Sequence, residues 1–270
     1  MHEDYIKLER TRRNWSAVVA VGLAAELAGA ILLLMGRHRA GLLIALGGLI
    51  LWMTARSVGS RRYTAGCADL RVRYGLKLQN AEPQDRKALA EQFDIYPLLP
   101  GSLKPNKPLL LHAFRGRWQG MDALAAEMTV GYEPKEKSRQ FLVGSLLSVD
   151  TPCSVPGLLA IFGQPYGGVS LSKWEGMDPV DTGDRGYLLL AESGAEVSEY
   201  VLDAFAAYGR SLEQDVPAII WTAPGRVHTF LPVQFYSGTW TLFKYMPEEA
   251  AGADPLPALA ELPKLLKKLG

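Results

Sequence analysis

The feature that most constrains this chain is a run of 21 residues, from Trp15 to Met35, that contains a single charged side chain, Glu26. A helix of about 20 residues, rising about 1.5 Å per residue, crosses the roughly 30 Å hydrocarbon core of a bilayer. The run therefore predicts a transmembrane helix. A cleaved signal peptide is the competing interpretation, but its apolar region usually has only about 7–15 residues, and here a second apolar run follows.

The second run extends over 16 residues from Ala40 to Ala55. It is short for a span, but flanking arginines can reach the interface, and the bilayer thins locally at modest cost. The connection from Gly36 to Arg39 is so short that the two helices must be antiparallel neighbours. We expect a cytoplasmic N-terminal tail over residues 1–14 and a transmembrane helical hairpin over residues 15–56.

Positive charge is distributed unequally around the hairpin, and this asymmetry predicts its orientation. Two basic residues, Arg37 and Arg39, lie in the connecting loop. Seven flank the outer ends of the two spans: Lys7, Arg10, Arg12, Arg13, Arg56, Arg61 and Arg62. The sequence therefore predicts an integral protein of the inner (cytoplasmic) membrane with both termini in the cytoplasm.

Glu26 shares one face of the first helix with three small residues, Gly22, Ala25 and Gly29, because these positions are spaced by three and four residues. The second run has a comparable face made of Gly41, Ala45 and Gly48. Small residues let membrane helices approach closely. We therefore expect the face around Glu26 to contact protein, and Glu26 is the candidate for an intramembrane functional residue.

A carboxyl group at the bilayer centre costs about 3 kcal/mol on insertion scales, and a proton or a partner lowers that cost. Three roles are open for Glu26. The first is a tolerated, protonated group that hydrogen-bonds within the hairpin. The second is a contact with another membrane protein or with a second copy of the chain. The third is a position in a proton or ion pathway of an oligomer.

Beyond the hairpin, the chain has the composition of a soluble protein. Its formal net charge of +1 gives no electrostatic reason to expect nucleic acid as a partner. Two cysteines, Cys67 and Cys153, are too few for a disulfide framework. We expect reduced thiols, with a Cys67–Cys153 bond as the alternative if the domain faced outward, and we expect no cofactor and no metal site.

The rest of the chain predicts an α+β protein. Residues 57–108 are expected to be a helical juxtamembrane segment and linker, with helices over 64–78 and from about 83 to 96. Residues 109–247 are expected to form an α+β domain with a largely antiparallel sheet. Its predicted strands are 109–114, 121–132, 140–149, 157–162, 186–192, two strands around the turn at 223–226, and 239–245.

One helix of this domain has a particularly clear pattern. Ser193 and Glu196 fit a capping box, and Gly209 suits a helix end. Between them an apolar stripe recurs at helical spacing, formed by Val197, Val201, Phe205 and Tyr208. We expect this stripe to pack on the sheet. Residues 248–270 predict a C-terminal amphipathic helix with a basic end.

Three stretches after the two spans, "FRGRWQGMDALAAEMTVGY", "LLSVDTPCSVPGLLAI" and "YLLLAESGAEVSEYVLDAFAAY", resemble a broad group of uncharacterised bacterial membrane proteins. In that group a helix pair precedes a cytoplasmic α+β domain. The resemblance covers residues 114–233. This chain has Ala125-Ala126-Glu127 where the group often has a Phe-Asp-Tyr-like strand. The resemblance implies the fold and the membrane location, and it carries over no catalytic residue.

No pattern in the sequence points to an active site. The acidic stretch lacks the spacing of a Ca²⁺ loop and predicts a solvated loop. The two strand histidines accompany no nucleophile motif, and the glycine-rich segment 163–168 fits neither phosphate-binding pattern. Large aromatic residues at strand positions predict core packing. The acidic stretch contains Glu175, Asp178, Asp181 and Asp184. The strand histidines are His112 and His228, and the large aromatic residues are Trp118, Trp174, Trp221 and Trp240.

Together these features predict a membrane-anchored cytoplasmic domain that binds or holds an unknown partner, with no evident catalytic activity. The expected partners are the lipid bilayer and another membrane protein or a second copy of the chain. One alternative is a membrane-tethered hydrolase or ligand-sensing domain whose pocket gathers the tryptophans and the acidic loop. A second alternative is a small oligomeric transport subunit built around Glu26.

Overall fold

The computed structural model describes residues 1–92, 104–105, 109–133, 140–163, 174, 176–212, 217–236, 240–253 and 257–270. The chain forms two compact units. We call residues 1–74 with 237–253 the helical unit, and residues 75–236 with 254–270 the sheet unit.

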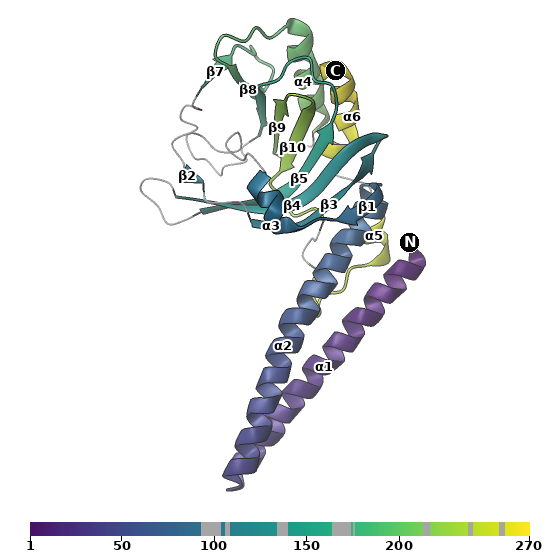
Figure 1. The fold of residues 1–270 in the computed structure, drawn as a ribbon, viewed down its shortest axis with the longest axis vertical. Helices are drawn as coiled ribbons and strands as arrows, with labels where there is room; N and C mark the ends of the chain where they lie inside the picture. The colour runs from purple at the N-terminus through teal and green to yellow at the C-terminus, as the bar shows by residue number, and fades with distance from the viewer. Residues whose placement is uncertain are drawn as a thin grey trace. The chain divides into compact units, whose positions relative to one another are not determined.

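The elements follow one another along the chain as Figure 1 shows. The helices are α1 (His2–Leu34), α2 (His38–Leu70), α3 (Arg86–Gln92), α4 (Glu199–Ser211), α5 (Glu248–Ala251) and α6 (Pro257–Leu269), and a π-helical turn spans Arg71–Gly75. The strands are β1 (Gln79–Pro83), β2 (Lys104–Pro105), β3 (Leu109–Trp118), β4 (Met121–Glu133), β5 (Gln140–Asp150), β6 (Leu158–Phe162), β7 (Met177–Val180), β8 (Tyr187–Glu192), β9 (Ala218–Ala223) and β10 (Arg226–Leu231).

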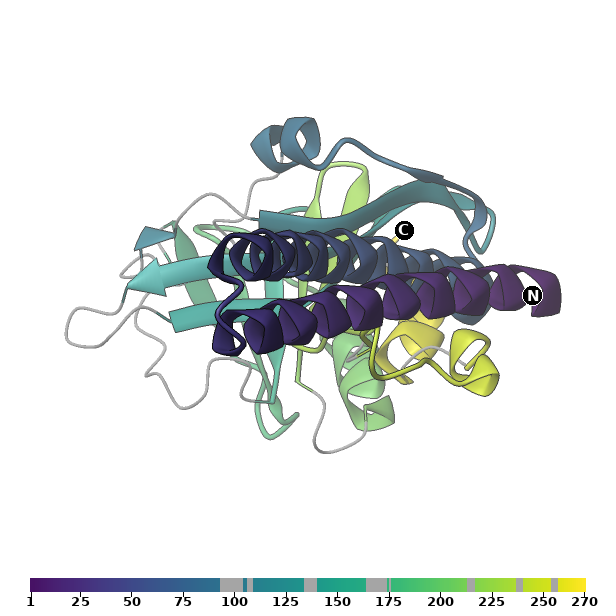
Figure 2. The same ribbon diagram turned by 90° about the horizontal axis from the view of Figure 1, so that it is seen from below.

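The helical unit is built on an antiparallel pair of 33-residue helices, α1 and α2, which lie side by side in Figure 2. Both helices extend beyond the apolar runs of the sequence, Trp15 to Met35 and Ala40 to Ala55. Polar residues from His2 onward already belong to α1, and α2 continues past Ala55 to Leu70. The segment predicted as a separate helix from Thr64 is therefore the end of α2.

The sharp reversal between the helices is a Schellman motif centred on Gly36. This glycine has a φ of +78°, which glycine adopts without steric cost. The N–H groups of Gly36 and Arg37 donate to the carbonyls of Leu33 and Leu32, at 3.1 and 2.9 Å. These bonds satisfy carbonyls left free at the end of α1, so α2 can begin at His38.

Glycine-to-backbone contact joins the two helices. A Cβ atom at Gly48 would lie 2.5 Å from the backbone nitrogen of Glu26, and one at Gly29 would lie 2.4 Å from that of Ala45. A Cβ atom at Gly22 would lie 2.8 Å from the backbone nitrogen of Trp52, and one at Gly41 would lie 2.7 Å from that of Leu33. The two small-residue faces identified in the sequence therefore meet each other, and no larger side chain fits between them.

The sheet unit confirms the α+β prediction. Its described strands form one antiparallel sheet in the order β1-β3-β4-β5-β10-β9-β6-β8-β7, with β2 paired to β4. β3 and β4 are joined by Gln119 and Gly120, whose φ angles of +52° and +84° fit a two-residue hairpin turn. The predicted turn between β9 and β10 is confirmed, with Gly225 at a φ of +70°.

One face of the sheet packs against α4 and α6, in the sheet unit. The ring of Phe162 lies 5.4 Å from those of Tyr187 and Tyr208. The Tyr187 hydroxyl donates to the Leu202 carbonyl of α4 at 2.8 Å, and the Tyr208 hydroxyl donates to the Ala258 carbonyl of α6 at 2.7 Å. The leucines of α6 are buried, so its apolar face is used inside this unit.

The predicted start of α4 is wrong. Gly194, at a φ of +86°, closes a turn in which the Ala195 N–H donates to the Glu192 carbonyl at 2.9 Å. This turn ends β8, and the chain stays non-helical until Ser198, the N-cap of α4. Ser193 and Glu196 therefore form no capping box.

The predicted end of α4 is also wrong. The helix continues through Gly209 to Ser211. A Cβ atom at Gly209 would lie 2.9 Å from the Phe162 ring. The glycine therefore serves a close contact between helix and sheet rather than a helix stop.

The strand predicted over residues 239–245 is a turn in the described residues 240–245. The backbones of Thr241 and Lys244 exchange hydrogen bonds of 2.9 and 3.1 Å, and the Thr241 hydroxyl accepts from the N–H groups of Phe243 and Lys244. Leu242, at the tip, is fully buried in the apolar cluster of the helical unit. The segment therefore packs through one buried leucine at the turn, and not through alternate side chains as a strand would.

Two adjacent glycines of α2 provide a matched test of the helix contact. We expect Gly48→Ala to destabilise the hairpin by about 1–3 kcal/mol, because its methyl group meets the α1 backbone. Gly47→Ala should be neutral or stabilising, because a Cβ atom there has no neighbour within 4 Å and alanine favours a helix. Unfolding of the full chain in mixed detergent–SDS micelles measures the difference, and equal stabilities would contradict the packing.

Candidate functional site

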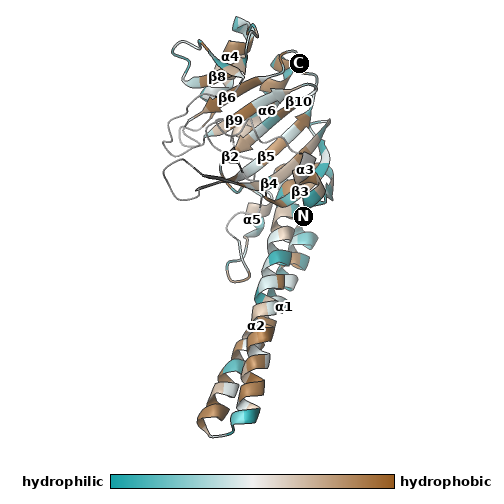
Figure 3. Ribbon diagram, turned by 60° about the vertical axis from the view of Figure 1, so that its left-hand side comes forward, coloured by the Kyte–Doolittle hydropathy of each residue, from teal (hydrophilic) through white to brown (hydrophobic). Residues whose placement is uncertain are grey.

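Apolar residues predominate in the part of α1 and α2 nearest the loop that joins them, as the hydropathy colours in Figure 3 show. Many of their large side chains are exposed, and we call this surface the apolar band. Only 17% of the most apolar 18-residue stretch of each helix is buried, and both helices are long and apolar enough to cross a membrane. Such a continuous apolar surface is rare on soluble monomers. The exposed members are Val21, Leu23, Leu27, Ile31, Leu34, Leu42, Leu43, Ile44, Leu46, Ile50, Leu51 and Met53.

Glu26 lies within this band. Its backbone nitrogen is at the close contact with Gly48, while its side chain is half-buried. In the described part of the chain, the carboxyl group has no hydrogen bond and no ion pair. The structure thus gives Glu26 no partner inside the hairpin, and its role stays a prediction.

Beyond the band, a buried carboxylate connects α1 and α2. Glu9 is 9% exposed and accepts hydrogen bonds from the Tyr63 hydroxyl at 2.9 Å and from Arg12 Nε at 2.8 Å. Tyr63 is fully buried, and its hydroxyl accepts from the Met246 N–H at 2.8 Å. Every member of this cluster is thus satisfied by another, which is the condition for burying polar groups without a large penalty.

The same cluster holds the return segment, residues 240–253, against the helices. Arg12 Nη1 and the Ser16 hydroxyl both donate to the Leu242 carbonyl, at 3.1 and 3.2 Å. His2 contacts Glu248 of α5 at 2.9 Å. The return segment therefore covers the polar end of the helical unit and forms part of its surface.

A cavity of about 540 Å³ opens at this polar end, and we call it the arginine cavity. Tyr5, Ile6, Glu9, Arg10, Arg12, Arg13, Asn14 and Tyr245 line it. Arg12 is paired with Glu9, whereas Arg10 and Arg13 form no ion pair or hydrogen bond with any other residue that the structure describes. The cavity therefore carries an excess of positive charge.

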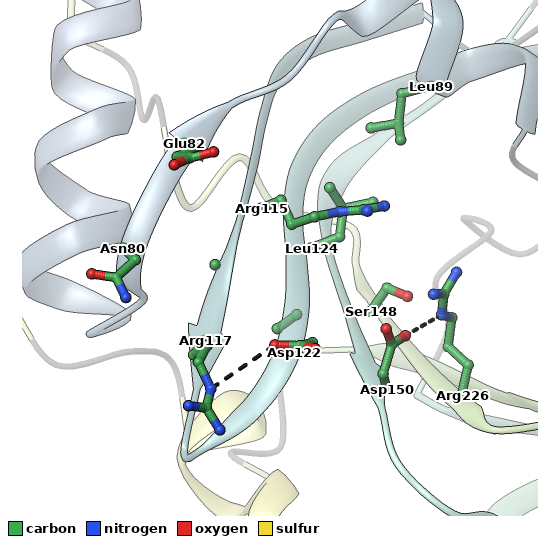
Figure 4. A pocket seen from close by; sticks show the side chains of 12 residues that line it. Asn80, Glu82, Leu89, Arg115, Arg117, Asp122, Leu124, Ser148, Asp150 and Arg226 are labelled. Atoms are coloured by element: carbon green, nitrogen blue, oxygen red, sulfur yellow. Dashed lines mark hydrogen bonds and ion pairs between the residues drawn. The ribbon is translucent and has the colours of Figure 1, made fainter.

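The sheet unit has a second cavity of about 350 Å³, shown in Figure 4. Its charged lining is balanced, with three arginines and three carboxylates: Arg115, Arg117, Arg226, Glu82, Asp122 and Asp150. Arg226 pairs with Asp150 at 2.5 Å, and Arg117 lies 3.9 Å from Asp122. We call it the sheet cavity.

Ser148 and His228 lie directly opposite each other on β5 and β10, beside the sheet cavity. Burial and the nearby Arg226 lower the pKa of His228 to about 3. The imidazole is therefore neutral at pH 7 and a weak base, far from the pKa that suits a general base there. It stacks on Trp221 at 4.6 Å, and the nearby Asp150 is paired with Arg226. This arrangement does not activate Ser148 as a nucleophile.

The tryptophans named in the sequence do not converge on one site. Trp174 and Trp221 belong to the apolar core of the sheet unit, and Trp118 is buried in β3. Trp240 packs in the helical unit. Three of the tryptophans are therefore core residues, as predicted, and Trp240 is half-buried against the apolar cluster of the helical unit.

The acidic stretch is exposed where it is described. Asp178 lies in the edge strand β7, which the sequence did not predict, and Asp181 accepts from the Gly183 N–H at 2.9 Å in a local turn. Asp184 is exposed. Glu175 and residues 164–168 of the glycine-rich segment 163–168 lie outside the described residues. Within the described ranges, no three His, Cys, Asp or Glu side chains form a group suited to a metal ion.

The other predicted residues are in ordinary structural positions. His112 lies in β3, as expected, and burial together with Arg86 lowers its pKa to about 4. Both cysteines are free thiols: Cys67 is buried in α2, in the helical unit, and Cys153 is half-buried in the sheet unit.

The Glu9–Tyr63 cluster and the arginine cavity were not predicted from the sequence. The available signal was a carboxylate, Glu9, three residues before an arginine in a basic helical stretch. No local pattern connects this stretch to the rest of the cluster. Tyr63 is 54 residues from Glu9 in the sequence, and Met246 is 183 residues from Tyr63.

Comparison with known proteins identifies no relative of this chain. No protein-family model matches it, and no curated protein matches it. Among solved structures, it is similar to the mycobacterial trehalose monomycolate transport factor A, TtfA, over 78% of this chain and 96% of that chain, with 10% sequence identity and a TM-score of 0.39. A likeness at this level carries no argument about fold or function.

The buried His228 predicts an acid-sensitive sheet unit. Its pKa of about 3 lies below the usual value of 6.5, so folding favours the neutral ring. The contribution of His228 to the free energy of unfolding is complete above pH 6.5. Below pH 6.5 this contribution decreases by up to about 1.4 kcal/mol for each pH unit. We expect wild type to lose about 2 kcal/mol more than His228→Gln between pH 7 and pH 5, measured by unfolding in detergent.

The exposed His38 provides the control, and His38→Gln should keep the pH dependence of wild type. Parallel curves for wild type and His228→Gln would contradict the buried neutral imidazole.

Proposed function

We propose that the chain is a non-catalytic membrane protein whose helical hairpin crosses the cytoplasmic membrane and anchors a cytoplasmic binding domain, the sheet unit. The observation that carries this proposal is the exposed apolar band on a glycine-packed helix pair. In water this surface would drive aggregation, whereas a bilayer covers it.

The dimensions of the hairpin support insertion. From Trp15 to Leu34, 20 residues at about 1.5 Å each span about 30 Å, the thickness of the hydrocarbon core. The guanidinium group of Arg62 lies 5.5 Å from the Trp15 ring, and that of Arg56 lies 5.4 Å from the Trp52 ring. Tryptophan and arginine together are typical of membrane interfaces. The excess of basic residues at the open end of the hairpin supports cytoplasmic termini.

A binding role is better supported than a hydrolase in the sheet unit. The tryptophans are dispersed, and His228 is a weak base beside a carboxylate that pairs with Arg226. A transport subunit would need several copies around Glu26, because two helices alone enclose no pathway.

The position of Glu26 supports a contact with another protein inside the membrane. Its half-buried side chain borders the exposed apolar residues, and among the described residues it has no partner. A carboxyl group in the bilayer is costly without one. We propose that another membrane helix, from a different protein or a second copy, supplies that partner.

Photo-crosslinking in intact membranes tests both parts of the proposal. A photoreactive residue would replace Leu27, which is next to Glu26 and 67% exposed, or Leu43, which is 72% exposed on α2. We expect lipid adducts from both positions and a discrete protein adduct from Leu27 alone. The protein adduct should disappear with Glu26→Leu and persist, weakened, with Glu26→Gln.

The outcomes separate the two parts. Absence of lipid adducts from both positions would contradict insertion. Lipid adducts without any Glu26-dependent protein adduct would contradict recognition by Glu26 and leave the hairpin as an anchor.

A further inference from the structure

The arginine cavity lies where the proposed membrane interface begins. We propose that it binds the headgroup of an anionic phospholipid, with the turn at Thr241–Tyr245 as an interfacial anchor beside it. This inference rests on the proposed insertion of the hairpin.

The depth of the cavity fits the headgroup layer. Asn14 lines the cavity and is adjacent to Trp15, where the apolar run starts. From Arg10 to Asn14, α1 rises about 6 Å, and the headgroup layer of one leaflet is about 5–7 Å thick. The guanidinium groups are therefore at the depth of lipid phosphates.

The charges of the cavity fit a phosphate. Glu9 is already neutralised by Arg12, which donates to both of its oxygens at 2.8 and 3.1 Å. Arg10 and Arg13 are exposed, and the described residues supply no carboxylate for either. Arginine forks match phosphate oxygens in geometry and charge, so two guanidinium groups remain for an anionic headgroup.

The return segment supplies the apolar part of the site. Leu242 and the Trp15 ring both lie against Gly59, where a Cβ atom would be 2.9 and 2.8 Å from them. The turn is thereby fixed at the level of Trp15. Phe243 is nevertheless 65% exposed, and Tyr245, which lines the cavity, is 56% exposed. Tyrosine favours the membrane interface, and an exposed phenylalanine beside it can enter the boundary between headgroups and acyl chains.

This combination distinguishes a lipid from a free anion. A soluble phosphate would use only Arg10 and Arg13, and it would gain nothing from the exposed Phe243. A phospholipid engages the guanidinium groups through its headgroup and the aromatic turn through the beginning of its acyl chains. The apolar run that starts at Trp15 leads from the cavity to the apolar band, along the path that those chains would take.

Native mass spectrometry of the full chain tests the proposal. Protein in detergent micelles would be incubated with equal amounts of phosphatidylglycerol and phosphatidylcholine. We expect wild type to retain phosphatidylglycerol selectively, and the double variant Arg10→Gln/Arg13→Gln to bind it roughly 10- to 30-fold more weakly. Adding inorganic phosphate at the lipid concentration should not displace the lipid.

The hairpin loop provides a matched control. Arg37 and Arg39 are also exposed and also flank the apolar band, but they do not line the arginine cavity. Arg37→Gln/Arg39→Gln should keep the selectivity of wild type. Equal losses in the two double variants would show general surface attraction and overturn the site, and displacement by phosphate would overturn the choice of a lipid.

Carbonate extraction of native membranes separates this inference from the proposed function. Release of wild type by carbonate would contradict insertion itself. Retention in the membrane without selectivity for phosphatidylglycerol would contradict only the lipid site.

Discussion

The close contact between the backbones of α1 and α2 is the constraint on which the helical unit depends. Gly48 meets the backbone at Glu26, and Gly29 meets it at Ala45. Lipid tails are as apolar as leucine, so apolar burial gives membrane helices little reason to associate, and contacts of this kind provide the attraction. They also direct the larger apolar side chains outward, which creates the exposed band.

The polar end of the helical unit is held by a different kind of interaction. There, Glu9, Arg12 and Tyr63 satisfy one another and fix the return segment through the backbone of Leu242 and Met246. Removal of a single partner would leave a buried polar group unpaired, which typically costs about 1–3 kcal/mol. The arginine cavity depends on this cluster, because Tyr245 of the return segment forms one of its walls.

Local patterns in the sequence predicted much of the fold. Uncharged length indicated the hairpin, alternation and turn residues indicated most strands, and the spacing of small residues indicated the helix contact. Two of the errors arose where a distant contact overrides a local pattern. Gly209 remains inside α4 because Phe162 approaches it, and residues 240–245 turn because Leu242 is buried against the helices. The arginine cavity was beyond prediction for the same reason, since Tyr245 is distant in sequence from α1.

The central claim is that the hairpin crosses the membrane, with the start of α1 and the end of α2 both on the cytoplasmic side. Single cysteines introduced by His38→Cys at the hairpin loop and by Gln119→Cys at the β3–β4 turn, in a chain carrying Cys67→Ala and Cys153→Ser, test it directly. A membrane-impermeant maleimide applied to intact spheroplasts should label the first position at once and the second only after permeabilisation. Labelling of both positions, or of Gln119→Cys alone, before permeabilisation would contradict the account.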